Sequence, residues 1–231
     1  MLPVLAWFMA LFAGPDAWFQ DGKLLYSDDF EHGLSRWSAE LEQPGRVEAK
    51  NGILTLDVPA GCTVWFKPEL KSPVRIEYDA VMVQRGGPND RVSDLNCFWM
   101  ATNVRRRSGR FAEYNDLRAY YVGQGGNTNT TTRFRRYIGD RELRPLLPQH
   151  DLSSKDVLLT PNVIQRIQLV AYGGRVQYVN NGRVIFDFHD PAPYTHGRFG
   201  FRTTFSHVEL RHFRVYRLRP AGPNPGDRDY D

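Results

Sequence analysis

The stretch from Asn127 to Tyr137, Asn-Thr-Asn-Thr-Thr-Thr-Arg-Phe-Arg-Arg-Tyr, gathers side chains that could bind a polar ligand. Its β-branched residues favour a β-strand, in which successive side chains point to opposite faces. One face of this strand would carry Asn127, Asn129, Thr131, Arg133, Arg135 and Tyr137. Because arginine offers a planar fork of donors to carboxylates and vicinal oxygens, we expect an anionic or polyhydroxylated ligand there. The alternative is the solvated outer face of an antiparallel sheet.

A second candidate strand, residues 198–207, supplies another arginine and a histidine. Strict alternation places on its core face Phe199, Phe201, Thr203, Phe205 and His207. Arg202 then points the other way and could join the arginines of the first strand, if both strands share a sheet. A bulge after Thr204 would instead turn His207 toward the ligand, where an imidazole could act as a general base. Without the bulge, His207 is a strand-end histidine bonded to backbone.

The middle of the chain adds further polar candidates. Asp94 and Asn96 alternate with apolar residues and could present a carboxylate and an amide at the polar end of a strand. Asp94 could equally cap a loop or pair with an arginine. Tyr114 and Asn115 fall in a loop-like segment, and loops at the rim of a sandwich often carry function.

Tyr120 and Tyr121 must point to opposite faces of their strand, so we expect at most one of them in the core. Tyr121 is therefore a candidate to stack on a sugar or to act as an acid, together with Tyr137. Trp65 and Trp99 are expected in the core.

These residues need a scaffold, and the rest of the sequence predicts an all-β one. The 231 residues suffice for one sizeable core, and short strand-like runs alternate with turn signals. The strongest turn signals are Asn51-Gly52, Gly173-Gly174 and Asn181-Gly182. We expect a single antiparallel two-sheet β-sandwich or jelly roll over residues 24–218, followed by a disordered tail at 219–231, which is rich in proline and glycine.

The apolar run at residues 2–13 has the length of a signal-peptide core and is too short to span a bilayer as a helix. We therefore expect a signal peptide over residues 1–17 and a secreted or periplasmic protein; a buried N-terminal segment is the alternative. Cys62 and Cys97 could form one disulfide or remain as core thiols.

The formal net charge of +4 comes without a basic helix, zinc-ligand spacing or RNA-binding aromatic signature, so no nucleic-acid partner is expected. No phosphate loop or dinucleotide fingerprint is present either, so no cofactor is expected. A structural calcium ion in the loops is one option, with Asp28, Asp29 and Asp90 as candidate ligands.

Several motifs in the sequence resemble those of known jelly-roll families. The opening Ser27-Asp-Asp-Phe-Glu-His-Gly-Leu34, with Trp37, resembles the first strand of concanavalin-like jelly rolls of the laminin-G and glucanase type. The closing runs 174–183 and 197–202 are similar to the last sheet of those folds. The segments 94–101, 114–115, 120–123 and 127–137 resemble an uncharacterised bacterial family, a domain of unknown function often found among carbohydrate-degradation genes. The resemblance covers roughly residues 25–218 and implies a concave sheet that could hold a glycan.

Two classes of function fit this resemblance. The first is an enzyme on acidic or complex polysaccharide, with β-elimination favoured over hydrolysis. Arg133, Arg135 and an asparagine would neutralise the uronate, His207 would be the base, and Tyr121 or Tyr137 the acid. The chain lacks the Tyr-x-Lys-x-Gly-x-Tyr strand of alginate-lyase-like jelly rolls and the Glu-x-Asp-x-x-Glu strand of the glucanases. The second class is a non-catalytic glycan-binding module.

Overall fold

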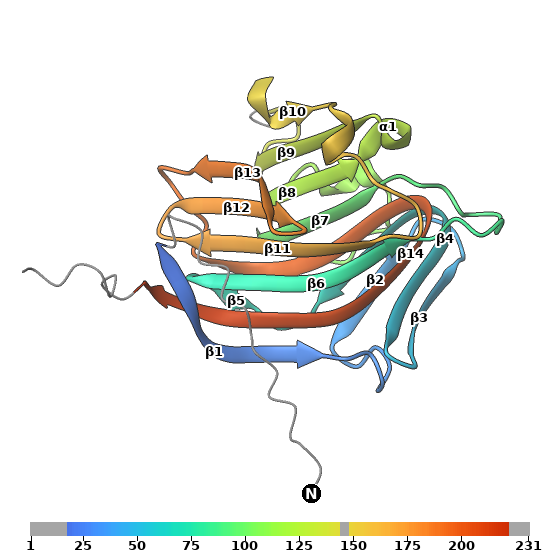
Figure 1. Ribbon diagram of the computed structural model, residues 1–231, viewed down its shortest axis with the longest axis horizontal. Helices are drawn as coiled ribbons and strands as arrows, with labels where there is room; N and C mark the ends of the chain where they lie inside the picture. Colours follow the sequence, from blue (N-terminus) through green and yellow to red (C-terminus); the bar gives the residue numbers. More distant parts are fainter. Residues whose placement is uncertain (1–17, 144–147, 222–231) are drawn as a thin grey trace, which may run out of the picture.

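The computed structural model describes residues 18–143 and 148–221 (Figure 1). The regular secondary structure of the described residues is almost entirely β-strand, with one four-residue helical turn and three short 3-10 turns. The strands are β1 (Phe19–Asp28), β2 (Trp37–Leu41), β3 (Arg46–Lys50), β4 (Ile53–Phe66), β5 (Leu70–Lys71), β6 (Val74–Met82), β7 (Leu95–Thr102), β8 (Arg118–Gly125), β9 (Thr131–Ile138), β10 (Asp151–Leu152), β11 (Ile164–Tyr172), β12 (Arg175–Asn180), β13 (Arg183–His189) and β14 (His196–Pro220). The helical turn is α1 (Gly126–Asn129), and the 3-10 turns are Phe111–Tyr114, Pro148–His150 and Lys155–Val157.

The predicted hairpin turns are confirmed. Asn51-Gly52 joins β3 to β4 with φ of 53° and 77°, and Asn181-Gly182 joins β12 to β13 with φ of 49° and 79°. Two-residue hairpins of this kind need positive φ at both positions, which asparagine and glycine tolerate best. Gly173-Gly174 joins β11 to β12 in the same way.

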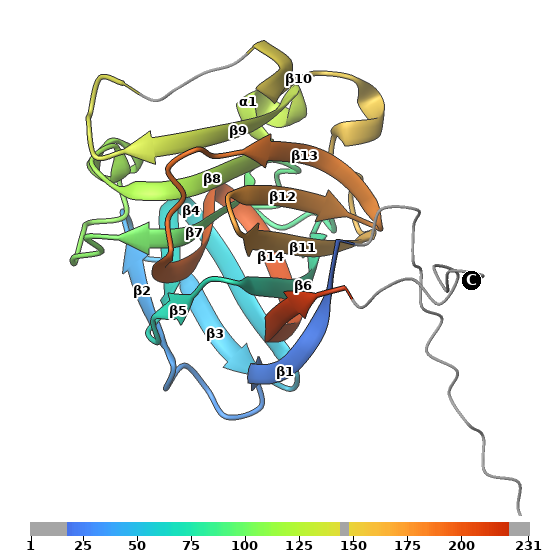
Figure 2. The same cartoon turned by 90° about the vertical axis from the view of Figure 1, so that its left-hand side faces the viewer.

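Strand β14 belongs to both sheets of the molecule. Its first half pairs with β7 and β4, whereas its second half pairs with β6 and β1. Sheet I therefore runs β10-β9-β8-β7-β14-β4-β2, and sheet II runs β13-β12-β11-β6-β14-β1, with every pairing antiparallel. Figure 2 shows the two runs of neighbouring strands, β9-β8-β7 and β13-β12-β11-β6. This confirms the antiparallel two-sheet sandwich.

The main core lies between the two sheets and is rich in aromatic rings. Phe134 of sheet I lies 5.9 Å from Phe186 of sheet II, and Tyr78 of sheet II lies 4.9 Å from Phe201, measured between ring centroids. Trp99 is also buried there, as expected. This interior supplies most of the hydrophobic stabilisation of the fold.

Cys62 and Cys97 are free thiols buried in this core. Burial raises the pKa of each thiol to about 12. Of the two alternatives for the cysteines, the structure therefore shows core thiols rather than a disulfide.

The strands extend from residue 19 to residue 220, because the end of β14 pairs with the start of β1. Arg219 and Pro220 are therefore strand residues, and the expectation of a disordered tail is wrong for these two residues. The expected signal peptide at 1–17 and most of the tail lie outside the described residues. Within the described part, no helix is long and apolar enough to cross a bilayer.

Candidate functional site

The register of sheet I places the predicted arginines on one face. Five residues are direct cross-strand neighbours in one row: Thr63 of β4, Arg202 of β14, Asn96 of β7, Gly123 of β8 and Arg133 of β9. Direct neighbours in an antiparallel sheet point to the same side. Arg202 and Arg133 thus share the face of sheet I that points away from the core, here called the outer face.

A second row on the outer face is aromatic. It contains Trp65, Gly200, Phe98, Tyr121 and Arg135, again as direct neighbours from β4 to β9. A Cβ atom on Gly200 would lie 2.6 Å from the indole, so the missing side chain lets Trp65 lie across β14. Trp65 is buried as expected, although in this second cluster and not in the main core.

The two neighbouring tyrosines point to opposite faces of β8, as predicted, but the outward-pointing one is not exposed. Tyr120 lies in the main core and Tyr121 lies on the outer face, but both are buried. Tyr137, from the next row of the outer face, is also buried. Burial raises the pKa of Tyr121 well above its usual value, so the phenol stays protonated at neutral pH.

Arg133 and Arg135 share one carboxylate. Asp151 of β10 lies 2.8 Å from Arg135 Nη1 and 3.5 Å from Arg133 Nε. The trio therefore carries one net positive charge, and the side chain of Arg133 remains 39% exposed. No sequence pattern points to Asp151, because a two-residue strand is too short to show one.

Asn127 and Asn129 do not extend the polar strand, and the strand predicted from residue 127 is wrong there. Both belong to the turn α1, where Asn127, Thr128 and Asn129 have φ of 52°, 60° and 56°. Asparagine tolerates this left-handed conformation because its side chain bonds locally. Asn129 bonds both the amide and the carbonyl of Leu159 at 2.9 Å, whereas Asn127 is exposed. The strand begins only at Thr131.

His207 is not on the core face, so strict alternation is wrong there, and the alternative of a bulge after Thr204 is confirmed. A bulge at Phe205, with φ of 44°, shifts the alternation and turns His207 off the core. Its Nδ1 lies 2.9 Å from Asp90 Oδ1. His207 stands five residues beyond Arg202 on β14, roughly 15 Å along the strand. Tyr137 lies at the opposite end of the face, so the predicted base and acid are not brought together.

Asp94 is the partner of an arginine, which was one of its alternatives. It forms an ion pair with Arg91 and accepts a hydrogen bond from Ser93 Oγ at 2.9 Å. The amide of Asn96 lies 3.5 Å from Asp94 Oδ1. Asp94 therefore sits beside the first row with its charge already balanced.

The connection between β7 and β8, residues 103–117, covers part of the outer face and is called the cap below. It is fastened by Glu40 of β2, a residue that the sequence analysis missed. Glu40 accepts hydrogen bonds from Tyr114 OH at 2.6 Å, Trp65 Nε1 at 3.0 Å and the amide of Arg107 at 2.8 Å. The predicted loop residue Tyr114 is thus a buried anchor, and Asn115 ends the 3-10 turn beside it.

Arg202 lies underneath the cap and is only 1% exposed. Its Nη1 donates to Thr63 Oγ1 at 2.7 Å and to the carbonyl of Gly109 at 3.1 Å. The rings of Tyr114 and Phe111 lie 4.7 and 5.0 Å from its guanidinium carbon. The expected open groove is therefore covered at Arg202, while Arg133 remains accessible.

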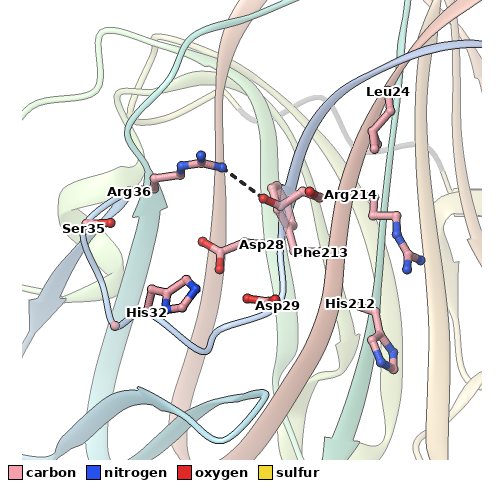
Figure 3. Close-up of a pocket in the computed structure, with 11 residues that line it drawn as sticks. Leu24, Asp28, Asp29, His32, Ser35, Arg36, His212, Phe213 and Arg214 are labelled. Atoms are coloured by element: carbon pink, nitrogen blue, oxygen red, sulfur yellow. Dashed lines mark hydrogen bonds between the residues drawn. The ribbon is translucent and has the colours of Figure 1, made fainter.

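A separate hollow of about 600 Å³ lies between the loop after β1 and the second half of β14 (Figure 3). Asp28, Asp29, His32 and His212 line it. Asp28 accepts a hydrogen bond from Trp37 Nε1 at 2.8 Å and so closes the loop. The third calcium candidate, Asp90, is bound to His207 elsewhere, and no group of three metal-ligating side chains occurs in the described part of the chain.

A family model described as "Domain of unknown function (DUF6250)" matches residues 56–213. A comparison with curated proteins finds no match.

Solved structures with the same fold include a protein of unknown function with a galectin-like fold from Bacillus subtilis, with a TM-score of 0.68 at 18% identity over 88% of this chain and 100% of that one. β-Agarase B from Zobellia galactanivorans has a TM-score of 0.57 at 10% identity, over 90% and 96% of the two chains. The carbohydrate-binding module CBM66 from Bacillus subtilis has a TM-score of 0.52 at 9% identity, over 80% and 96%. At these identities the similarity establishes the jelly-roll fold.

Proposed function

The chain belongs to the DUF6250 family, a domain of unknown function, and we propose that it binds acidic carbohydrate on the outer face of sheet I. The observation that carries the proposal is the polar row Thr63, Arg202, Asn96 and Arg133, which runs across neighbouring strands. A row that only packed beneath the cap would be apolar, as the neighbouring row with Trp65 and Phe98 largely is. The agarase and the carbohydrate-binding module with this fold support a saccharide as the ligand.

Arg133 is the first contact that we assign to the ligand. It is partly exposed, and its only ionic partner among the described residues is Asp151, which also neutralises Arg135. One positive charge therefore remains for a uronate carboxylate, with a guanidinium fork to bind two oxygens.

Binding without cleavage fits the geometry best. Hydrolysis needs a pair of carboxylates with room for sugar or water between them. Glu40, Asp94 and Asp151 are each already held by donors or arginines. His207 is too far along β14 to act as a base beside Tyr137.

A second candidate, β-elimination, is favoured by one observation. At Gly123, the space of the absent side chain lies 2.7 Å from Tyr121 OH and 3.2 Å from Asn96 Oδ1, which places a phenol beside an amide. Lyase chemistry uses an amide or arginine to neutralise the carboxylate and a phenol to protonate the leaving oxygen. The exported location expected from residues 1–17 would bring either activity to extracellular polysaccharide.

Calorimetric titration with oligouronates in low salt tests the binding proposal. Arg133→Ala should weaken binding by about tenfold to a hundredfold, because a charge-assisted hydrogen bond contributes about 1.5–3 kcal/mol. Arg183→Ala is the matched control, since Arg183 is also a solvent-accessible arginine paired with a single aspartate. Unchanged binding in Arg133→Ala would remove the proposal.

Cleavage is tested in the same samples by the ultraviolet absorbance of the unsaturated product. A lyase would lose turnover in Tyr121→Phe while retaining binding. A binding protein shows no such product with any variant.

A further inference from the structure

The guanidinium of Arg202 lacks the partners that a buried charge normally has. In the part of the chain that the structure describes, its Nε and Nη2 have no hydrogen-bond acceptor, and its Nη1 donates only to the neutral oxygens of Thr63 and Gly109. Asn96 Oδ1, in the neighbouring position of the same row, is buried and equally unpartnered. Buried charges are normally paired, and an unpaired buried polar group is costly. The arginine is therefore set up for an acceptor that the closed protein does not supply.

The cap supplies one substitute for that acceptor. The carbonyl of Gly109 accepts from Arg202 Nη1, which leaves the other two nitrogens unsatisfied. We propose that Arg202 is a covered subsite for a carboxylate, and that the cap is displaceable and occupies this subsite with the Gly109 carbonyl until ligand binds. This inference rests on the proposed function and names the second contact of the same outer face.

The closed position of the cap depends on glycine at two places. Gly109 has φ of 92°, and a Cβ atom there would lie 2.5 Å from the amide nitrogen of Glu42 and 2.7 Å from the carbonyl carbon of Leu41. On the other side, a Cβ atom on Gly61 would lie 2.4 Å from the Gly109 carbonyl oxygen. The cap thus touches the body of the protein backbone to backbone, and one methyl group would prevent the contact.

The edge of the cap is open and carries both arginines and carboxylates. A hollow of about 550 Å³ lies where the cap meets β2, lined by Glu40, Arg106 and Arg107 among others. Arg105, Arg106 and Arg110 are exposed on the cap itself. Arg105 pairs with Asp116 and Arg110 with Glu42, so among the described residues Arg106 is the unpaired arginine at this edge. An acidic saccharide would be attracted to this edge before it reaches Arg202.

Gly109→Ala tests the cap without altering any residue that binds ligand. The readout is the rate at which phenylglyoxal modifies Arg202, followed by mass spectrometry of its peptide, with partly exposed Arg133 as the internal reference. We expect labelling of Arg202 to rise by about tenfold, which corresponds to a loss of about 1.4 kcal/mol in the free energy of cap closure. Gly86→Ala is the matched control, because Gly86 has φ of 93° but nothing within 4 Å of the added Cβ atom.

Tyr114→Phe provides an independent way to loosen the cap, because it removes the 2.6 Å bond to Glu40 and keeps the ring over Arg202. It should also raise labelling of Arg202, and by less than Gly109→Ala. If both folded variants label Arg202 no faster than Gly86→Ala, the cap is not displaceable and the inference is wrong.

Oligogalacturonate then tests the subsite. It should protect Arg202 from phenylglyoxal in Gly109→Ala, and it should bind this variant about tenfold more tightly than the wild type. The gain should disappear in Gly109→Ala/Arg202→Met. Increased labelling without protection would overturn the subsite. Because the labelling rate is measured without saccharide, its result does not depend on whether Arg133 binds a uronate.

Discussion

At the scale of single residues, the carboxylate of Asp90 shows how several hydrogen-bond donors can act on one titratable group. Burial alone would raise the pKa of Asp90, but the amides of Arg85 and Gly87 and the imidazole of His207 outweigh it and lower the pKa. The two amides lie 2.6 and 2.9 Å from Oδ2. These donors favour the ionised carboxylate in the folded state, and the unfolded chain lacks them.

A pH dependence follows from this lowered pKa. The contribution of Asp90 to stability is complete above its unfolded pKa of about 3.9 and is lost as pH falls through the lower folded value. Asp90→Asn should therefore unfold at lower urea concentration than the wild type at neutral pH, and the two midpoints should approach each other below about pH 4. The exposed Glu69→Gln is the control and should run parallel to the wild type. A constant gap between Asp90→Asn and wild type down to about pH 3 would contradict the assignment.

At the scale of elements, α1 interrupts the regular strand geometry between β8 and β9. It forms a left-handed turn between β8 and β9, and the turn includes Thr128, with φ of 60° and ψ of 50°. A β-branched residue in this conformation costs roughly 1–2 kcal/mol, because its Cβ crowds the backbone. The turn is held in place by Asn129, whose side-chain amide donates to the carbonyl of Leu159 and accepts from its backbone N–H.

Thr128→Gly should consequently stabilise the protein by about 1 kcal/mol, measured as the free energy of unfolding in urea. Thr130→Gly is the contrasting variant, since Thr130 has φ of −111° and donates to the Asn127 carbonyl. It should destabilise the protein, because glycine adds chain entropy to the unfolded state and removes that bond. A loss of stability in Thr128→Gly would show that the left-handed turn is not strained.

At the scale of the whole molecule, the two sheets are not separate units. Both contain β14, and their facing side chains form one aromatic core. Neither sheet can lose its strand pairing without exposing the inner face of the other.

We therefore expect one cooperative unfolding transition. Scanning calorimetry should give equal calorimetric and van't Hoff enthalpies, and near-UV and far-UV circular dichroism should change together. Two resolved transitions, one for each sheet, would contradict this expectation.

Local patterns in the sequence determined the fold class and which residues share a face. Alternation placed Arg133, Arg135 and Tyr137 together on β9, and the Asn-Gly pairs marked two hairpins. Both signals act over a few residues, because side-chain direction and turn conformation are local properties of the backbone. Predictions from alternation are wrong at two places, the bulge at Phe205 and the left-handed turn α1. Each shifts the alternation of side chains without a clear signal in residue type.

Only the tertiary structure decided how open the outer face is. Glu40 and Tyr114 are 74 residues apart in the chain, and their hydrogen bond holds the cap over Arg202. Asp151 reaches Arg133 and Arg135 through a strand of two residues, and Asp90 reaches His207 across 117 residues. Such partners are set by the register and curvature of the sheets, which depend on the packing of the whole core and on no local pattern.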